Sequence, residues 1–455
     1  MAELGHQVLG VDLNMSRITM LESGSSPIFE PGVDDLLARH TASGRLRFTS
    51  SFAGIGAADL HFLAVGTPQQ PDNGSYDLNQ LFGATQLLAS RLREPTVVVG
   101  MCTVPVGTAG RVAEVLRECS PAGADVDLVW HPEFLRESHA VDDTLRPDRM
   151  VFGFGPDAGE RGDGQPDGTR SPAEERIREC FAPIIDAGTP TIMTDWATAE
   201  MIKSAANAFL AAKISFVNGM SEVCDAVGAD VYQLAEAIGH DPRIGHAGMR
   251  PGLGYGGGCL PKDLRGFGTR LRELGLVRVN AMLDDINVIN DRCRTRLVEI
   301  VEQHCGGTVV GKRIAVWGAA FKPGTDDIRD SPALAVIRAL HHDGADVVVA
   351  DPKALANTRR FLPEVEFADD AVAAVDGADI LLHLTDWAQF GRIDPAGLRP
   401  LSDRPVLVDG RGTLDAARWT AAGWGYRALG RPWVDPVDDA VARVPVGAGA
   451  SDGRG

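Results

Sequence analysis

The sequence lacks the features of membrane, exported and nucleic-acid-binding proteins. None of its apolar runs approaches the roughly 18 residues needed to span a bilayer, and residues 1–10 lack the basic and apolar segments of a signal peptide. Its 62 acidic residues outnumber the 44 lysines and arginines, which form no cluster suited to a phosphate backbone. We therefore expect a cytoplasmic protein that binds neither membranes nor nucleic acid.

Cysteine is scarce, and its spacing argues against two common structural roles. The seven cysteines are an odd number, and no two of them are spaced as Cys-x-x-Cys. A disulfide framework needs paired cysteines, and a cysteine zinc site needs closely spaced ligands. We therefore expect reduced thiols and no bound metal ion.

The strand patterns predict two α/β domains, in keeping with a length of 455 residues. Helical patterns alternate with short apolar runs, which favours an α/β fold with two Rossmann-like, doubly wound parallel sheets. The runs that predict strands occur in both halves of the chain, at 8–12, 60–66, 96–100, 313–318, 346–351 and 380–384.

The middle of the chain, from about residue 195 to residue 290, shows only a helical pattern, with apolar residues at three- and four-residue spacing. We expect this region to join the two α/β domains and to form the contact of a homodimer. A segment rich in glycine and proline at 156–173 predicts a mobile loop. The expected divisions are an N-terminal domain (1–193), a central helical dimerisation domain (194–300), a C-terminal domain (301–435) and a tail (436–455).

The first α/β domain has no glycine-rich phosphate turn. Gly5 precedes Asp12 by the same interval that separates Gly344 from Asp351, so the two segments are equivalent helix-strand units. A dinucleotide fold places its acidic ribose ligand roughly 20 residues after the GxGxxG turn, which counted back from Asp12 falls before Met1. The opening strand and its turn are therefore missing from this sequence.

Residues 253–263 combine a nucleophile with charged partners. Glycines at five positions between 252 and 258 let the backbone approach a ligand closely, and Cys259, Lys262 and Asp263 follow them. An arbitrary cytosolic cysteine is usually a small buried apolar residue, but the residues that flank this one favour a nucleophile. A nearby lysine would lower the pKa of the thiol.

A second candidate pair lies in the central helical segment. Lys203 and Asn207 are four residues apart and therefore share one helix face. A solvated lysine and an ordinary asparagine are the simpler interpretation, but apolar neighbours such as Phe209 and Leu210 indicate a largely buried helix. A buried pair needs a polar partner, and an oxyanion formed at a carbonyl would be one.

In the first domain, loops that follow predicted strands are further candidates, because α/β sheets bind ligands at the carboxyl ends of strands. These loops are 65–68, 102–108 and 131–138. Glu133 and Glu137 of the last loop share a face if it opens a helix, and are otherwise better interpreted as two solvated carboxylates.

In the second domain, two segments after strands carry cations suited to phosphate oxygens. Lys322 and Arg329 lie in the segment 321–332, and Arg411 lies in the segment 409–412.

The chain carries eight ordered motifs: SPIFEPGVDDLL (26–37), VGTP (65–68), TVPVGT (103–108), HPEFLRES (131–138), the run from Lys203 to Asn218, DPRIG (241–245), GYGGGCLPKD (254–263) and FKPGTDDIRDSP (321–332). Over nearly the whole chain, these motifs resemble those of the UDP-glucose/GDP-mannose dehydrogenase family. The resemblance implies an N-terminal NAD-binding domain, a central dimerisation region and a C-terminal UDP-binding domain.

The resemblance implies a four-electron oxidation of the primary alcohol of a nucleotide sugar to a carboxylate, with two NAD⁺ used in turn. Cys259 would attack the aldehyde intermediate, and the resulting thiohemiacetal would be oxidised to a thioester that water hydrolyses. Lys203 and Asn207 would hold the oxyanion. The other implied catalytic residues are Asp263, which would orient or activate water, Glu133, which would assist thioester hydrolysis, and Thr103, which would support the reacting centre.

The resemblance also implies binding residues. Asp12 would hold the adenosine ribose of NAD, with Arg17, Thr67, Thr103, Glu137, Lys262 and Arg329 also around the cofactor. The nucleotide sugar would contact Arg243 of the partner subunit and, in the same chain, Glu133, Phe134, Leu135, Arg136, Glu137, Lys203, Asn207, Leu253, Gly254, Tyr255, Gly256, Gly257, Lys322 and Arg411.

The chain departs from the family pattern in two places. The family opens with a strand and a GxGxxG turn, whereas this chain starts inside the helix that should follow, which lowers the expected affinity for NAD. We hypothesise that Met1 is an internal methionine of a longer protein, which the upstream reading frame would test. Cys102 stands where the family usually has serine, which is a small change.

UDP-glucose is the favoured substrate, because PIFEPG (27–32) and DPRIG (241–245) resemble the enzymes that use it. The alternatives within the family are GDP-mannose and a UDP-N-acetylhexosamine. An alternative of another class is a nucleotide-sugar-binding protein without catalysis, which only the missing phosphate turn suggests. The intact catalytic set argues against it.

Overall fold

The computed structural model describes residues 1–156, 170–402 and 404–437. They form two compact units, of which unit 1 comprises Met1–Ala212 and Gly258–Asp285 and unit 2 comprises Lys213–Gly257 and the described residues from Ile286 onwards. The expected loop at 156–173 and the expected tail at 436–455 lie mostly outside the described residues.

Unit 1 contains a five-stranded sheet of order β3-β4-β5-β6-β7. All neighbouring pairs are parallel except β5 and β6, where Trp130 opposes Gly153 in antiparallel register. The predicted strand at 96–100 is confirmed without change, and the one at 60–66 ends earlier. The strands are β3 (Leu60–Leu63), β4 (Thr96–Gly100), β5 (Val126–Trp130), β6 (Met150–Phe154) and β7 (Thr191–Asp195).

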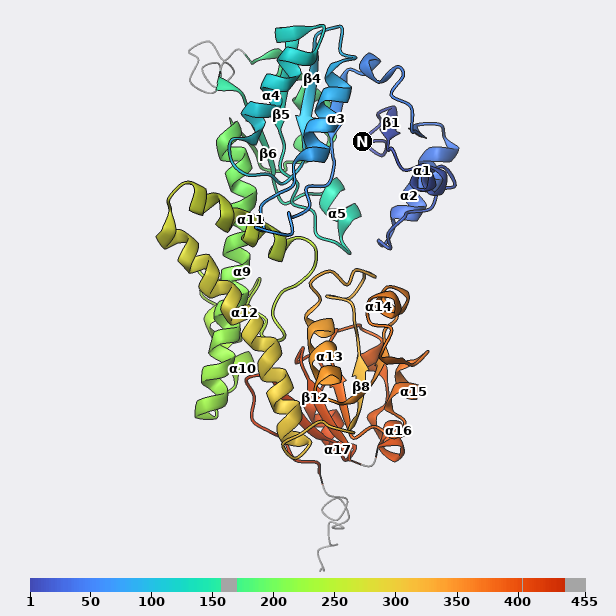
Figure 1. Ribbon diagram of the computed structural model, residues 1–455, viewed down its shortest axis with the longest axis vertical. Helices are drawn as coiled ribbons and strands as arrows, with labels where there is room; N and C mark the ends of the chain where they lie inside the picture. Colours follow the sequence, from blue (N-terminus) through green and yellow to red (C-terminus); the bar gives the residue numbers. More distant parts are fainter. Residues whose placement is uncertain (157–169, 403, 438–455) are drawn as a thin grey trace, which may run out of the picture. The chain divides into compact units, whose positions relative to one another are not determined.

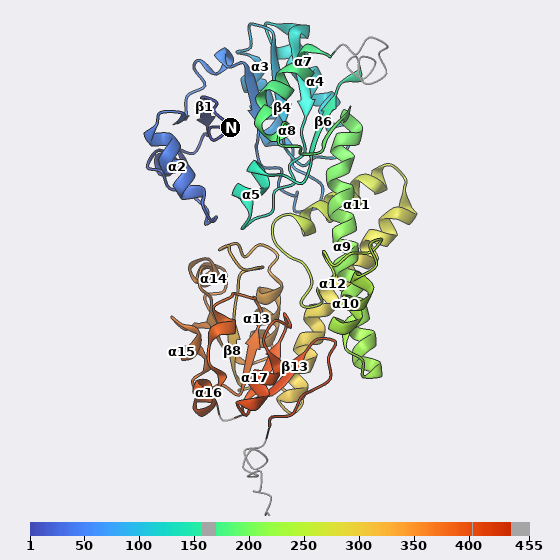
Figure 2. The same cartoon turned by 180° about the vertical axis from the view of Figure 1, so that it is seen from behind.

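Helices cover both faces of this sheet, which explains why β4 is a continuous apolar run. Val98 packs with α3 and α4 on one face (Figure 1), and Val97 and Val99 pack with α7 and α8 on the other (Figure 2). The helices are α3 (Asn79–Ala89), α4 (Thr108–Cys119), α5 (Ala140–Leu145), α7 (Pro172–Cys180) and α8 (Ala182–Ile185).

The first residues of unit 1 form a separate two-stranded parallel sheet, β1 (Val8–Val11) and β2 (Leu46–Thr49), with helices α1 (Met15–Glu22) and α2 (Val33–Ala42). Residues 1–5 form hydrogen-bonded turns, so the expectation that the chain starts inside a helix is wrong. Gly5 ends this segment with a φ of 106°, and so few residues cannot propagate a helix. Among the described residues, no strand joins β1 to β3, and no GxGxxG turn lies in unit 1.

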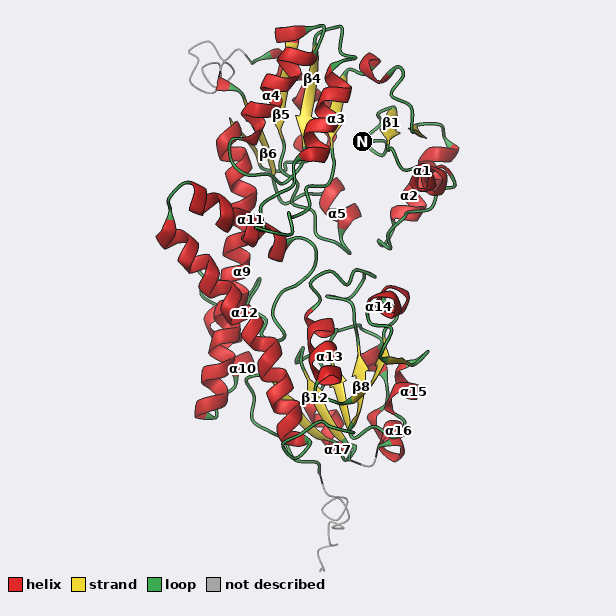
Figure 3. Cartoon of the chain, in the orientation of Figure 1, coloured by secondary structure: helices red, strands yellow, loops and turns green. Residues whose placement is uncertain are grey.

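Residues 196–304 contain helices and no strand, as the sequence predicts (Figure 3). The chain passes between the units inside two of these helices, α9 and α12, and between Gly257 and Gly258. The helices are α9 (Trp196–Val227), α10 (Val231–Gly239), α11 (Leu260–Glu273) and α12 (Val277–His304).

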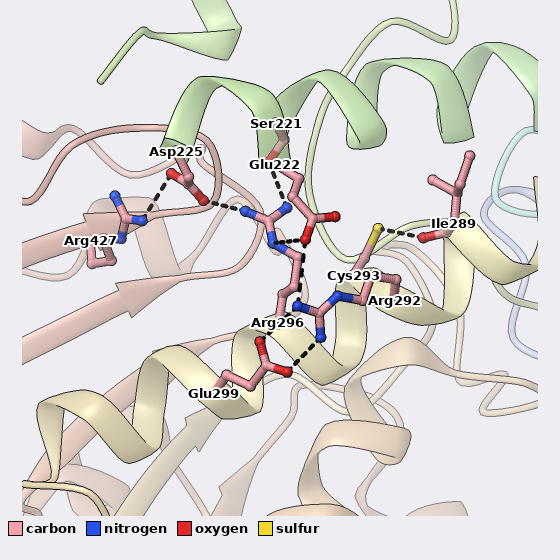
Figure 4. Close-up of polar contacts among 9 residues, drawn as sticks. All are labelled: Ser221, Glu222, Asp225, Ile289, Arg292, Cys293, Arg296, Glu299 and Arg427. Carbon is pink, nitrogen blue, oxygen red and sulfur yellow. Dashed lines mark hydrogen bonds and ion pairs between the residues drawn. The ribbon is translucent and has the colours of Figure 1, made fainter. Parts of the chain in front are cut away.

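Within unit 2, buried ion pairs tie α9 to α12 (Figure 4). Asp225 of α9 accepts hydrogen bonds from Arg296 of α12 and, at 2.9 Å, from Arg427 of strand β13 (Gly425–Ala428). Within α12 itself, the partly exposed Arg292 donates to Glu299 at 3.0 Å. A hollow of about 330 Å³ lies beside these pairs, and none of its lining residues is a predicted site residue.

The C-terminal part of unit 2 is a six-stranded, fully parallel sheet of order β10-β9-β8-β11-β12-β13. The chain reverses direction across the sheet between β8 and β11, where a doubly wound fold binds its ligands. The remaining strands are β8 (Arg313–Trp317), β9 (Asp346–Ala350), β10 (Glu366–Phe367), β11 (Ile380–His383) and β12 (Val406–Asp409).

Helices cover both faces of this sheet as well. Val316 and Val349 pack with α12 and α13 on one face, and Trp317 and Leu381 pack with α15, α16 and α17 on the other. The helices are α13 (Pro332–His342), α14 (Leu355–Phe361), α15 (Ala371–Val375), α16 (Pro395–Leu398) and α17 (Ala416–Ala421). Among the described residues, none of the helices combines the length and apolar character that crossing a bilayer requires.

Candidate active site

Cys259 is the residue that immediately precedes helix α11 in unit 1. Its side chain is reachable from solvent, and its carbonyl accepts the backbone N–H of Asp263 at 2.9 Å. The helix begins with Leu260 and Pro261, and proline suits a first turn because the N–H it lacks would be unpaired there. The thiol therefore stands at the positive end of a helix, which favours a thiolate.

Asp263, in the first turn of α11, is 2% exposed and joins three segments beside Cys259. The Tyr76 hydroxyl donates to Oδ1 at 3.2 Å, and the Lys262 ammonium donates to the same oxygen at 2.7 Å. The Asn207 amide of α9 donates to Oδ2 at 2.6 Å. This buried carboxylate is therefore held by three donors from different parts of unit 1.

The expectation that helix α9 is largely buried is wrong at Phe209 and Leu210, which are 70% and 38% exposed. Lys203 lies one turn before the partly buried Asn207 on α9, and the prediction that the two share one helix face is confirmed. Its side chain is buried, and its ammonium lies 5.6 Å from the ring centroid of Phe134. Burial lowers the pKa of Lys203, whereas the charges of Asp263, Cys259 and Glu133 raise it. Lys203 is thus a poorly solvated cation that faces the nucleophile.

The pKa of Cys259 is raised, mainly by burial and further by the charges of Asp263 and Glu137. Lys203 and Lys262 lower it, as expected of nearby lysines, but they do not outweigh these effects. The prediction of a lowered pKa is therefore wrong in its net sign. Although the side chain reaches solvent, protein atoms crowd the sulfur, and crowding disfavours its charged form.

The loops after β3 and β4 meet at the carboxyl edge of the sheet. The Thr67 hydroxyl donates to the carbonyl of Thr103 at 2.8 Å, which joins the two loops. Asp12 follows β1 and accepts Arg17 at 2.6 Å. Hydroxyls and a carboxylate at strand ends fit the riboses of a dinucleotide.

The segment 131–138 is a loop, and α5 begins only at Ala140, so no helix places Glu133 and Glu137 on a shared face. The Glu133 carboxylate accepts the N–H of Leu135 at 2.7 Å. Arg136 is paired with Asp143 through a bond of 2.6 Å. Glu137 acts on the candidate nucleophile through its charge.

The glycines at 252–257, in unit 2, accommodate protein atoms. A Cβ on Gly254 would lie 2.2 Å from Asn290 Oδ1, and one on Gly257 would lie 2.6 Å from the Phe321 ring. Both glycines have positive φ. Leu253 is fully buried, and the Tyr255 hydroxyl donates to Asn287 at 2.8 Å. The glycine pattern thus reflects tight packing, whereas the sequence suggested close approach to a ligand.

The predicted cations of unit 2 have partners in the protein. Arg411 donates to the carbonyls of Leu384 at 2.6 Å and Phe321 at 3.0 Å, and burial lowers its pKa. The Arg329 guanidinium pairs with the Asp327 carboxylate, and the shortest hydrogen bond between them is 2.6 Å. The remaining two predicted cations also make local contacts, Arg243 with Asp241 at 2.6 Å and Lys322 with the Phe321 ring at 5.4 Å.

Three buried groups escaped the sequence analysis. Tyr76 binds Asp263, as described above. Glu200 of α9 accepts the N–H groups of Gly107 and Ala109 at 2.7 and 2.6 Å, at the start of α4, and burial raises its pKa to about 7. Glu30 accepts the N–H groups of residues 138 and 140 at 2.8 and 2.9 Å. Only Glu30 had a signal, because it belongs to the motif at 26–37.

Comparison with known proteins gives consistent matches along the chain. The sequence matches three domains of the UDP-glucose/GDP-mannose dehydrogenase family: the NAD binding domain at residues 1–161, the central domain at 197–292 and the UDP binding domain at 315–416. A UDP-glucose 6-dehydrogenase of Rhizobium meliloti is 39% identical over 433 residues, which cover 95% of each chain. Another, from Haloferax volcanii, is 39% identical over 420 residues, covering 90% of this chain and 92% of that one.

Solved structures agree with these matches. A UDP-glucose dehydrogenase from the archaeon Pyrobaculum islandicum superposes with a TM-score of 0.84 at 34% identity, covering 95% of this chain and 94% of that one. A UDP-D-MAnNAc dehydrogenase from Pyrococcus horikoshii, at 23% identity and a TM-score of 0.77, shares the fold.

Proposed function

Because the chain belongs to the UDP-glucose/GDP-mannose dehydrogenase family, we propose that it oxidises UDP-glucose to UDP-glucuronate in two successive steps. The family makes it an NAD-dependent nucleotide-sugar 6-dehydrogenase. The relatives named above support UDP-glucose as the substrate. The observation that carries the proposal is the cluster of Cys259, Lys203, Asn207 and Asp263 in unit 1.

In the proposed mechanism, the thiolate of Cys259 adds to the aldehyde carbon left by the first oxidation. The carbonyl oxygen becomes an oxyanion, which Lys203 and Asn207 stabilise by charge and by hydrogen bonding. NAD⁺, when bound, accepts one hydride in each oxidation step. The second oxidation leaves a thioester on Cys259, which water cleaves to the carboxylate and the restored thiol.

Asp263 and Glu133 are the two carboxylates proposed to act on the hydrolytic water. Asp263 already accepts three donors, so its first role is to hold Asn207 and Lys262 in place. Glu133 is close enough to Lys203 to raise its pKa. We assign Glu133 the assisting role in hydrolysis and Asp263 the orientation of water and of its donors.

The proposed NAD contacts are Asp12 for the adenosine ribose and Thr103 for the nicotinamide ribose, with the other contacts being Arg17, Thr67, Glu137, Lys262 and Arg329. The proposed nucleotide-sugar contacts are Arg243 of the partner subunit and, within the same chain, the segments 133–137 and 253–257 with Lys203, Asn207, Lys322 and Arg411.

We propose further that the protein is a cytoplasmic homodimer formed through the central helices. Exposed apolar side chains on α9 support the dimer, since Phe216, Val223 and Val227 are 52%, 51% and 70% exposed. Val288 of α12 is 66% exposed. All seven cysteines are unpaired thiols, which fits a reducing compartment.

The test is to count NADH formed per UDP-glucose consumed. Two NADH per sugar is the expected result, and Cys259→Ser should abolish acid formation while UDP-glucose still binds. Unchanged acid formation by Cys259→Ser would show that the thioester route is wrong. Turnover of GDP-mannose or a UDP-N-acetylhexosamine in place of UDP-glucose would reassign the substrate, and binding without any NADH would favour a binding protein.

A further inference from the structure

Three exposed side chains converge at the end of α10 in unit 2, outside the proposed active-site cluster. Glu236 lies in the last turn of α10, and His240, the residue that follows the helix, comes four positions later. His246 returns to them from the loop that follows. One ligand atom from each of the three side chains lies within 4.8 Å of the others.

The distances within this cluster match those around a metal ion. His240 Nε2 lies 3.2 Å from one oxygen of Glu236, and His246 Nδ1 lies 3.6 Å from the other. A tetrahedral zinc ion with ligands at about 2.0–2.2 Å separates its ligand atoms by about 3.4 Å. Each imidazole nitrogen thus lies at about that distance from a carboxylate oxygen, but from a different oxygen of Glu236. The side chains must therefore rotate to bring one oxygen and both nitrogens around a single ion, and the three ligand atoms that would do so already lie within 4.8 Å of one another.

The backbone is shaped to bring His246 to this place. Gly239 ends α10, and a Cβ there would lie 2.3 Å from Nδ1 of His246, so only glycine leaves room for the imidazole. Gly245 turns the chain back with a φ of 70°. The N–H groups of Ile244 and Gly245 both donate to the carbonyl of Asp241 at 2.9 Å, which closes the loop.

We propose that Glu236, His240 and His246 form a binding site for a divalent transition-metal ion, with Zn²⁺ as its representative. Two imidazoles and one carboxylate are a ligand set that zinc accepts, and the fourth position stays open to water. The lack of closely spaced cysteines predicted no metal ion, but this site contains no cysteine. The third ligand here becomes apparent only when the loop folds back.

A metal ion at this site would join the two ends of the loop 240–246. That loop carries Arg243, which is 87% exposed at its side chain. Because we assign Arg243 to the sugar site of the partner subunit, metal binding would also steady that contact, an effect that rests on the proposed function. Zinc binding itself does not depend on that function.

The experiment is a calorimetric titration of the tag-free, metal-stripped full chain with ZnCl₂, with Co²⁺ absorption as a second readout. We expect one tight equivalent and a cobalt spectrum without thiolate charge transfer. Glu236→Gln and His246→Asn should each weaken binding by more than about tenfold, since even the loss of a residue that only orients a metal ligand costs about that much. The control is His342→Asn, another exposed histidine of unit 2, which should bind as the unmodified chain does.

A further variant, Gly239→Ala, tests whether the position of His246 matters when all three ligand residues are present. Gly239→Ala keeps all three ligands and improves helix propensity, but its methyl group displaces the His246 ring. It should lose zinc affinity while its melting temperature without metal is maintained. The proposal is overturned if the chain binds no zinc, or if Glu236→Gln, His246→Asn and Gly239→Ala all bind it unchanged. Because binding is read without substrate, this outcome is independent of whether the chain oxidises UDP-glucose.

Discussion

At Cys259, two lysines oppose the effects of burial and of two carboxylates on the pKa of the thiol. Lys203→Met removes one of these cations without adding charge, so the pKa of Cys259 should rise further. Only the thiolate is alkylated, so the rate with iodoacetamide should rise with pH, and the variant should need a higher pH to react. At a fixed pH below the pKa we expect it to react roughly three- to tenfold more slowly.

The matched control is Lys213→Met, an identical substitution at a partly exposed lysine of the same helix, whose ammonium donates to the carbonyl of Ile244 at 2.9 Å. It should leave the alkylation profile of Cys259 unchanged. Mass spectrometry separates Cys259 from Cys119, the other exposed cysteine. Equal rates at Cys259 in both variants would contradict the assignment of Lys203 as its cation.

The residue scale also shows what periodicity can predict. The spacing of Lys203 and Asn207 predicted a shared face, since both lie on one helix. Their partner Asp263 was a candidate because of its nearness to Cys259. Tyr76 could not be predicted, because its hydroxyl reaches Asp263 across 187 positions of sequence. A long-range side-chain contact leaves no local pattern.

In helix α11, Gly266 gives Tyr76 the space to reach Asp263. A Cβ on Gly266 would lie 2.2 Å from the Tyr76 ring, which is itself buried. Gly266→Ala should therefore push the ring away, break its hydrogen bond to Asp263 and lower kcat. The clash should destabilise the fold by about 1–3 kcal/mol, as overpacking does.

Two variants outside α11, Tyr76→Phe and Gly83→Ala, serve as comparisons for Gly266→Ala. Tyr76→Phe removes the hydroxyl without a clash and should also lower kcat, but with little change in melting temperature. Gly83 lies in helix α3, and a Cβ there meets nothing within 4 Å, so Gly83→Ala should leave kcat unchanged and should raise the melting temperature slightly through its better helix propensity. A normal kcat in Gly266→Ala and Tyr76→Phe would show that Tyr76 does not position Asp263.

At the start of α4, Glu200 couples the stability of a helix to pH. Burial raises the pKa of Glu200 from 4.5 to about 7, so the folded protein holds a proton that the unfolded chain releases. Its contribution to the free energy of unfolding should therefore be complete below pH 4.5 and should fall by about 3 kcal/mol as the pH rises through about 7.

Glu200→Gln removes this titration and keeps the shape of the side chain. The melting temperature of the unmodified chain, measured relative to this variant, should be higher at pH 5 than at pH 8. Circular dichroism at several pH values gives both curves. A constant difference between the two proteins would show that Glu200 is ionised throughout, held by the N–H groups of Gly107 and Ala109.

Elements were predicted best where burial alone determines them. The valines of 96–100 gave a strand with the correct bounds because both faces of that strand are buried. The segment 131–138 was ambiguous, because its conformation depends on carboxylates from elsewhere. Glu30 accepts the N–H groups of Ser138 and Ala140 and so helps to fix where α5 begins. A single local sequence does not contain that information.

For the whole molecule, the alternation of strand and helix patterns predicted two α/β sheets and a helical middle region. It did not predict the division of the chain into two compact units. Both α9 and α12 contribute to each unit, so the unit boundaries fall inside helices. A periodic helical pattern continues across such a boundary without change. Sequence patterns therefore locate secondary structure more readily than the grouping of helices by contact.

The last prediction concerns the proposed dimer. An apolar helix face that is exposed to water either binds a partner or lowers the solubility of the protein. Val223 and Val227 lie on one face of α9 and are both exposed. Light scattering should give twice the 48.3 kDa mass of the chain. Val223→Asp places a charge in the contact and should shift the mass towards one chain. Val372→Asp, at an exposed valine of α15, should leave the dimer intact.

Turnover should fall together with the molar mass measured by light scattering, since Arg243 is proposed to act in the partner's site. Val223→Asp should therefore lose turnover at concentrations at which it is monomeric, although its own Cys259 cluster is complete. A monomeric variant with full turnover would remove Arg243 of the partner subunit from the site and leave the central helices with a structural role only. A dimer that persists in Val223→Asp would place the contact on another surface.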